Sequence, residues 1–141
     1  MSLQQVVKIE PEVMDAYTYR VQTTDGTLYV TICDVNDEVF KVALVIGKTG
    51  SQVRAWTEAL QEVINIVLLS GIPLVRVISA TSNITTGKVK IHQPGINIRS
   101  GPEGVAYALM KYLQEKGRER DERNKGKERQ ASLEYGEFDE G

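Results

Sequence analysis

The sequence predicts an α+β fold: a three- or four-stranded antiparallel sheet packed against two long helices, followed by a disordered or helical charged C-terminal tail. Residues 17–46 contain three short stretches of strand-like apolar pattern, separated by turn residues. From residue 51 onward, apolar residues recur at helical spacing in two long segments with glycine, proline and polar residues between them. Because an antiparallel sheet of this kind needs a cover on one face, we expect the helices to supply it.

The first two stretches predict a β-hairpin. Apolar and polar residues alternate in each, and the dipeptide Asp25-Gly26 between them is a tight-turn signal. Residues 39–46 follow a second turn and are almost continuously apolar, so we expect this third strand to be the central one. Residues 6–9 have the composition of a further short strand, interrupted by Pro11. The alternating apolar residues are Tyr17, Tyr19 and Val21, then Leu28, Val30 and Ile32.

The first long helix is predicted to begin near Ser51, whose hydroxyl is the expected cap, and to stop at Gly71, just before Pro73. One side is apolar and is expected to pack on the sheet, while the other side is polar and is expected to face solvent. The apolar stripe comprises Val53, Trp56, Leu60, Val63, Ile64, Val67 and Leu68. The polar side comprises Arg54, Glu58, Gln61 and Asn65.

A second long helix is predicted to begin at Ser100. Ser100 and Glu103 have the spacing of a capping box, and Pro102 suits the first helical turn. Residues 73–79 favour a short helix between the two long ones, and residues 81–95 favour irregular or weakly extended chain. The inward face of the second long helix comprises Val105, Leu109, Tyr112 and Leu113.

The length of 141 residues fits one domain, and a change of composition near Gly117 predicts where that domain ends. We expect residues 1–117 to form a single α+β domain. Residues 118–141 are polar with charges of both signs and then acidic, which predicts a charged, flexible tail. An alternative interpretation is that Leu133, Tyr135 and Phe138 form a short docking motif.

Composition narrows the classes of function. Charged residues make up 26% of the chain and the formal net charge is -2, which argues against a DNA or RNA polymer as main partner. With one cysteine, Cys33, and one histidine, His92, we expect no metal site and no internal disulfide, and we expect no cofactor. No signal-peptide pattern and no membrane-spanning run is visible, so we expect a cytoplasmic protein without a membrane partner.

A glycine-rich turn precedes the first long helix. Its residues Gly47-Lys48-Thr49 resemble the end of a nucleotide-triphosphate P-loop, but Val42 occupies the position where that motif requires its first glycine. An ordinary strand-to-helix turn is therefore the better interpretation than an ATPase site. The free backbone N–H groups at the helix start, with Lys48 beside them, still favour an anion.

Two arginines are candidate phosphate ligands. Arg54 lies one turn into the first long helix, where a guanidinium can hold an anion at the helix start through two hydrogen bonds. Arg99 directly precedes the cap of the second helix and is expected to reach an anion there. The alternative for Arg54 is an ordinary solvated side chain.

Three further residues are candidates for contact with a ribose or base: Asn83, His92 and Asn97. His92 has no serine, cysteine or acid placed by the sequence to work with it, so we predict no catalytic residue and no enzyme activity. A surface histidine is the alternative interpretation. We also expect Trp56 and the tyrosines to belong to the core.

Several segments resemble the TSCPD domain, including the one at the C-terminus of adenosylcobalamin-dependent ribonucleotide reductases. They are residues 38–40, 47–51, 60–69 and 70–74, and then Arg99-Ser100-Gly101-Pro102-Glu103 before a helix. The family name records the string Thr-Ser-Cys-Pro-Asp, whereas the corresponding string at residues 99–103 contains no cysteine, so the resemblance implies no redox or metal role there. It implies, as one hypothesis, an accessory or regulatory domain associated with ribonucleotide reduction.

As a small stand-alone chain, the sequence also resembles the phage Thoeris anti-defence family of the first type. That resemblance implies a sponge that sequesters glycocyclic ADP-ribose, or cyclic oligonucleotides, without cleaving them and so counteracts bacterial anti-phage defence. It also implies a dimer-based homo-oligomer, up to a hexamer, in the cytoplasm of an infected bacterium. On this preferred hypothesis Arg54 and Arg99 contact phosphates and Lys48 adds charge, while Asn83, His92 and Asn97 lie near ribose or base.

Overall fold

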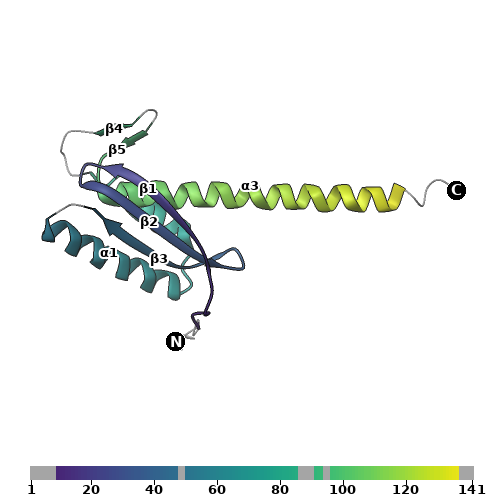
Figure 1. Cartoon of the computed structure of the whole chain (residues 1–141), viewed down its shortest axis with the longest axis horizontal. Coiled ribbons are helices and arrows are strands. Elements are labelled where there is room, and N and C mark those ends of the chain that lie inside the picture. Colours follow the sequence, from purple (N-terminus) through teal and green to yellow (C-terminus); the bar gives the residue numbers. More distant parts are fainter. Residues whose placement is uncertain (1–8, 48–49, 86–90, 94–95, 137–141) are drawn as a thin grey trace. The chain divides into compact units, whose positions relative to one another are not determined.

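The computed structural model describes residues 9–47, 50–85, 91–93 and 96–136, and it confirms the α+β class (Figure 1). Two compact units are present, residues 1–110 and 111–141. In chain order the elements are β1 (Asp15–Thr23), β2 (Gly26–Val35), β3 (Glu38–Ile46), α1 (Ser51–Leu69), α2 (Leu74–Thr81), β4 (Ile91–Gln93), β5 (Ile96–Ile98) and α3 (Gly101–Gly136).

The three predicted strands form one antiparallel sheet in the order β1-β2-β3. The prediction that the third strand is central was wrong: β2 is central, because each of two hairpins joins it to a sequence neighbour. The second hairpin turns through Asn36 and Asp37, both with positive φ, as a tight hairpin turn requires. The apolar run of β3 is not buried on both faces, since Val45 is 60% exposed.

Helix α1 runs along the outer edge of β3 (Figure 1). Asn65 accepts a hydrogen bond from the Val42 N–H at 2.8 Å and donates one to the Val42 carbonyl at 3.0 Å. Gln61 accepts a third from the Leu44 N–H at 2.8 Å. These two amides replace part of the fourth strand that an edge would otherwise recruit. The prediction that Gln61 and Asn65 face solvent was therefore wrong.

The apolar residues of α1 do not all face the sheet either. Ile64 and Leu68 are buried, as predicted, but Trp56 is 72% exposed and Val63 is 57% exposed. The expectation that Trp56 belongs to the core was wrong. The helix begins at Ser51, as predicted, but the predicted Ser51 cap was wrong, because the N-cap position is Gly50 and no side chain caps it.

The core of the first unit lies on the inner face of the sheet, against the beginning of α3. Gly104 makes the close approach possible: a Cβ atom there would lie 2.7 Å from Cγ2 of Thr23 and 3.3 Å from Cδ2 of Leu28. Helix α2, predicted from residues 73–79, adds buried side chains from one face. The buried core residues on the strands are Val21, Leu28, Val30, Ile32, Val42, Leu44, Ile46 and, on β5, Ile98. Those on the helices of this unit include Ile64, Leu68, Leu74, Val77, Val105, Ala106, Ala108 and Leu109.

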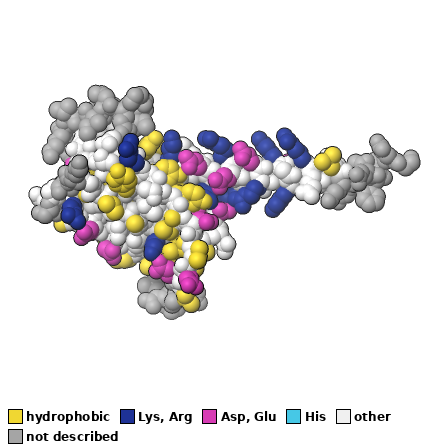
Figure 2. Space-filling view, in the orientation of Figure 1, with side chains coloured by type: hydrophobic (Ala, Val, Ile, Leu, Met, Phe, Trp, Pro, Cys, Tyr) yellow, Lys and Arg dark blue, Asp and Glu magenta, His cyan; other side chains and the backbone are white. Residues whose placement is uncertain are grey.

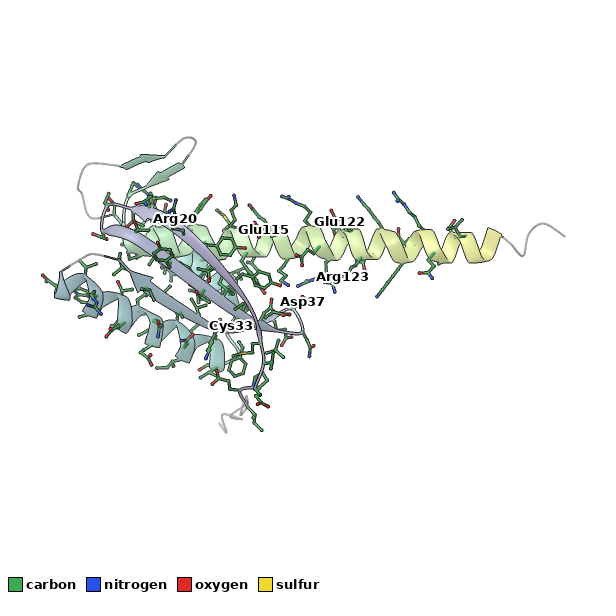
Figure 3. All side chains as sticks on the ribbon, viewed as in Figure 1. Arg20, Cys33, Asp37, Glu115, Glu122 and Arg123 are labelled. Atoms are coloured by element: carbon green, nitrogen blue, oxygen red, sulfur yellow. The ribbon has the colours of Figure 1, made fainter. Side chains whose placement is uncertain are left out.

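Two further regions complete the description. Strands β4 and β5 form a separate antiparallel hairpin, of which β4 lies within residues 81–95, predicted to be irregular or weakly extended, and β5 follows that region. Helix α3 continues through the charged segment to Gly136, and its side chains from residue 118 to 133 are exposed. Lysine and arginine side chains project along this part (Figure 2), and Figure 3 labels the neighbouring Glu122 and Arg123 there. Of the predicted short strand at residues 6–9, residues 6–8 lie outside the described residues, as does the motif residue Phe138, and Ile9 is not in a strand.

In the described part of the chain, no helix combines the length and the apolar character that a bilayer span requires.

Candidate functional site

A cavity of about 360 Å³ lies above one end of the sheet's inner face, between α1 and the first turn of α3. Strands β2 and β3 supply its floor, and Val53 near the start of α1 faces Gly101 and Pro102 at the start of α3 across it. The beginnings of both long helices therefore border one cavity. The remaining lining residues are Asp25, Leu28, Leu44, Ile46, Trp56, Thr57, Leu60, Ile84, Ser100 and Val105.

The hydroxyl groups in this cavity already donate their hydrogen bonds to backbone carbonyl groups. The Thr57 hydroxyl donates to the Val53 carbonyl at 2.8 Å. The Ser100 hydroxyl donates to the Ile84 carbonyl and accepts the Glu103 N–H at 3.2 Å. Oxygen acceptors remain, at Thr57 and at the Asp25 carboxylate. The lining thus suits an apolar or ring-shaped group that carries hydrogen-bond donors.

The start of α3 already holds a carboxylate. Oδ2 of Asp25, from the turn between β1 and β2, accepts the Gly101 N–H at 2.9 Å. Ser100 is the N-cap, as predicted, but only half of the predicted capping box forms, because Glu103 turns to a different partner. A negative charge at a helix N-terminus is favourable there and disfavours a second anion at the same place.

Arg99 is that partner. Its Nε donates to Oε2 of Glu103 at 2.9 Å, and the two side chains are 33% and 15% exposed. The Arg99 carbonyl also accepts a hydrogen bond from the Thr24 hydroxyl at 2.8 Å, which ties this residue to the turn that carries Asp25. A phosphate bound by Arg99 would have to share the guanidinium with Glu103. The role of Arg99 in phosphate binding stays a prediction.

The start of α1 has a different electrostatic environment. Its N-cap is glycine, no acidic residue lies in its first turn, and the exposed Arg54 follows Val53 of the cavity lining. Nothing acidic on this turn competes for the helix N–H groups, so an anion is better accommodated here than at α3. Lys48, predicted to add charge at this point, lies outside the described residues.

The remaining candidates fall into two places. Asn83 is exposed, has a φ of 65°, and directly precedes Ile84, whose carbonyl is bonded to Ser100. Asn83 and Arg99 are therefore the sequence neighbours of Ile84 and Ser100, which are in contact. His92 and Asn97 are directly opposite each other in the β4–β5 hairpin. The side chains of His92 and Asn97 lie outside the part of the chain that the structure describes.

None of the residues that line the cavity was predicted as a site residue; those that bear most on a ligand are Asp25, Trp56 and Thr57. Asp25 was assigned only to a tight turn, and nothing local in the sequence indicates that this turn meets a helix start 76 residues later. The position of Trp56 in the predicted apolar stripe was taken as a sign of burial in the core. Its side chain instead lines the cavity while remaining mostly exposed.

Comparison with known proteins gives one family match. The TSCPD domain model matches residues 4–113, which is most of the chain and includes the sheet, α1, α2 and the start of α3. No curated protein and no solved structure gave a significant match. The resemblance to the Thoeris anti-defence family is not among these matches. The matched segment contains every element that borders the cavity. Because the match covers well over half of the chain, the chain belongs to the TSCPD domain family.

Proposed function

We propose that this protein binds a small cyclic nucleotide and sequesters it without changing it, with the base in the cavity and a phosphate at the start of α1. The observation that carries the proposal is the cavity's position, with an apolar lining bordered by one helix start that has no acidic residue in its first turn. A volume of about 360 Å³ lies within the usual range for small-molecule sites.

The distribution of polar groups supports a particular orientation of the ligand. Carboxylate and hydroxyl acceptors lie inside the cavity, at Asp25 and Thr57, whereas a cationic side chain, Arg54, lies on the exposed side of α1. A phosphate inside would meet the Asp25 carboxylate, so the phosphate belongs outside and the donor-bearing base inside. Arg54 and Lys48 are then the proposed phosphate ligands, and Asn83, His92, Asn97 and Arg99 are proposed ribose or base contacts.

Sequestration rather than catalysis is favoured by the state of the cavity's hydroxyls. The Ser100 hydroxyl donates to a backbone carbonyl and caps α3, and the Thr57 hydroxyl donates to its own helix. Among the residues that the structure describes, neither hydroxyl is hydrogen-bonded to a base that could activate it, and nucleophilic catalysis by a hydroxyl requires such a partner. The finer proposal, from the resemblance to the Thoeris anti-defence family, is that the ligand is glycocyclic ADP-ribose or a cyclic oligonucleotide.

The test is titration calorimetry of the full chain with glycocyclic ADP-ribose, followed by heat denaturation and chromatography of the released ligand. Saturable binding and recovery of the unchanged ligand are expected. A cyclic dinucleotide is titrated in parallel, and linear ADP-ribose is the control that carries the same groups without the ring. Recovery of a cleaved product would replace sequestration with catalysis. Absence of binding to all three ligands would contradict nucleotide binding and leave the accessory role in ribonucleotide reduction as the next hypothesis.

A further inference from the structure

The apolar side chains that line the cavity differ widely in exposure. Leu28 and Leu44, on its floor, are almost fully buried. Trp56 is 72% exposed and Ile84 is 45% exposed, and among the described residues these are the two exposed large hydrophobic side chains of the lining. Exposure that rises from a buried floor to these two residues identifies the side of the cavity that opens to solvent. Trp56 and Ile84 therefore lie at its opening.

These two residues belong to different walls of the cavity. Trp56 belongs to α1, where Val53 and Leu60, about one turn before and after it, are part of the same lining. Ile84 belongs to the wall formed by the start of α3, because its carbonyl accepts the hydrogen bond from the Ser100 hydroxyl. A planar ring that enters the opening would therefore meet the indole on one side and an aliphatic side chain on the other.

The indole of Trp56 is available for such a contact. Among the residues that the structure describes, its side chain takes part in no hydrogen bond and no ring contact. Nucleobases stack on exposed aromatic side chains because the two flat surfaces leave water together, and tryptophan offers the largest such surface. The fold does not use this ring to build its core, which leaves the ring free for a ligand.

The position of Trp56 along α1 also fits a nucleotide whose phosphate lies at the helix start. Trp56 is five residues after Ser51, the first residue of the helix, which corresponds to about 7.5 Å along the axis at about 1.5 Å per residue. In a nucleotide one ribose separates the phosphate from the base, and that separation is of the same order. A phosphate at the helix start and a base against Trp56 can therefore belong to one ligand.

We infer that the indole of Trp56 is the stacking surface for the base of the bound nucleotide, with Ile84 against the other face of the ring, and that this stacking selects purine over pyrimidine nucleotides. The inference rests on the proposed function, which places the base in the cavity. A purine has two fused rings and a pyrimidine has one, so a purine covers more of the exposed indole and removes more apolar surface from water. This selection by ring size is separate from any hydrogen bond to the edge of the base.

The first test uses the fluorescence of the full chain. Trp56 is the single tryptophan, so emission excited beyond the absorption of the six tyrosines reports this side chain alone. Titration with glycocyclic ADP-ribose should quench the emission and protect it from acrylamide, with the same Kd that calorimetry gives, because the stacked base covers the indole. AMP and UMP, which carry the same ribose and phosphate, are then compared as competitors. AMP should displace the ligand at a concentration roughly tenfold lower than UMP.

The second test separates stacking from apolar contact. Trp56→Leu keeps an apolar side chain without an aromatic face and should lower the affinity roughly ten- to hundredfold, whereas Trp56→Phe keeps a smaller aromatic face and should lose less. Ile66→Ala is the matched control, because Ile66 is 63% exposed on the same helix and does not line the cavity. It should bind like the parent. Circular dichroism checks that the variants fold, and the emission of the parent gives an answer without any substitution at Trp56.

The outcomes separate this inference from the proposed function. Binding in calorimetry with unchanged emission, or with parent-like affinity in Trp56→Leu, would overturn stacking and leave nucleotide sequestration in place. Displacement by AMP and UMP at equal concentrations would overturn the selection of purines. Emission that responds to protein concentration and not to nucleotide would assign Trp56 to a protein contact instead. Absence of nucleotide binding in calorimetry would overturn the proposed function itself, and the stacking role with it.

Discussion

Asn65 on α1 and Val42 on β3 form a pair of hydrogen bonds, one in each direction, through the side-chain amide of the first and the backbone of the second. The pair is equivalent to the contact that a neighbouring strand would make. It closes the edge of β3 and fixes the position of α1 along that edge, and hence the position of the first turn of α1 beside the cavity.

Asn65→Leu should destabilise the domain by about 1 to 3 kcal/mol, because the Val42 N–H and carbonyl would lose their partners beneath an apolar side chain. Asn65→Asp should cost less, since one acceptor oxygen remains for the N–H. Urea unfolding monitored by circular dichroism measures both. Glu58→Gln, on the exposed side of the same helix, is the control and should be nearly neutral. Equal stability of Asn65→Leu and the parent would show that water replaces the amide at this edge.

A second prediction compares two glycines of the same helix. Gly104→Ala should destabilise by about 1 to 3 kcal/mol, because the new methyl would lie 2.7 Å from the fully buried Thr23 side chain. Gly126→Ala has nothing within 4 Å of the added atom and should stabilise α3 by up to about 1 kcal/mol through helix propensity. Thermal unfolding of both variants checks the opposite signs. A stabilising Gly104→Ala would mean that α3 can move away from the sheet at little cost.

Much of this fold could be predicted from the sequence because its signals are local. The Asp25-Gly26 turn, the alternation around it and the Ser100 cap each depend on a few adjacent residues, and all three are present in the structure. The strand order was missed because an apolar run indicates that a strand is buried but does not indicate which neighbouring element buries it. In β3 part of that cover comes from the side chains of a helix rather than from another strand.

The candidate site was harder to predict for a related reason. Arg54 and Arg99 could be placed at helix starts from spacing alone, but the groups that decide whether an anion fits come from distant parts of the chain. Asp25 reaches the start of α3 from the first hairpin. Two helix starts that look alike in the sequence therefore differ in the structure, because one already holds a carboxylate and the other has none in its first turn.

A third prediction concerns pH. A hydrogen bond with Glu10, and next the charge of that carboxylate, raise the pKa of Lys41 above its ordinary value of 10.5. Since the pKa is raised in the folded state, the ion pair contributes fully below pH 10.5 and its contribution is lost as the pH rises through the raised value. Titration of the Lys41 side chain by NMR should show the raised pKa in the parent and its return towards 10.5 in Glu10→Ala. High salt should shrink the difference, because both side chains are partly exposed. Identical titration of the two proteins would show that the ion pair does not persist in solution.

A fourth prediction concerns base selection and depends on the proposed function. Oδ2 of Asp25 is bonded to Gly101, and its other oxygen has no partner among the described residues. It should accept a hydrogen bond from an exocyclic amino group, so the adenine form of a cyclic nucleotide should bind roughly tenfold more tightly than the hypoxanthine form. Asp25→Asn keeps an acceptor for Gly101 and can offer an amide donor to the base. It should reduce or reverse the preference, as measured by calorimetry with both ligands. An unchanged preference would place the base elsewhere.

The last prediction distinguishes the two arginines. Arg54→Ala should fold like the parent and lose roughly ten- to hundredfold in nucleotide affinity, because it removes charged hydrogen bonds to the phosphate without disturbing any side-chain contact in the structure. Arg99→Ala has a second effect, since it leaves the largely buried Glu103 carboxylate without its cation and should lower stability as well as affinity.

Glu103→Gln separates the effect of Arg99 on stability from its effect on nucleotide affinity. This variant releases the Arg99 guanidinium from its carboxylate partner while keeping the size of the side chain. If Arg99 also contacts the phosphate, this variant should bind the nucleotide more tightly than the parent. If the start of α1 alone holds the phosphate, Glu103→Gln should leave the affinity unchanged while Arg54→Ala still lowers it. Parent-like affinity in both arginine variants would exclude phosphate binding at either helix start.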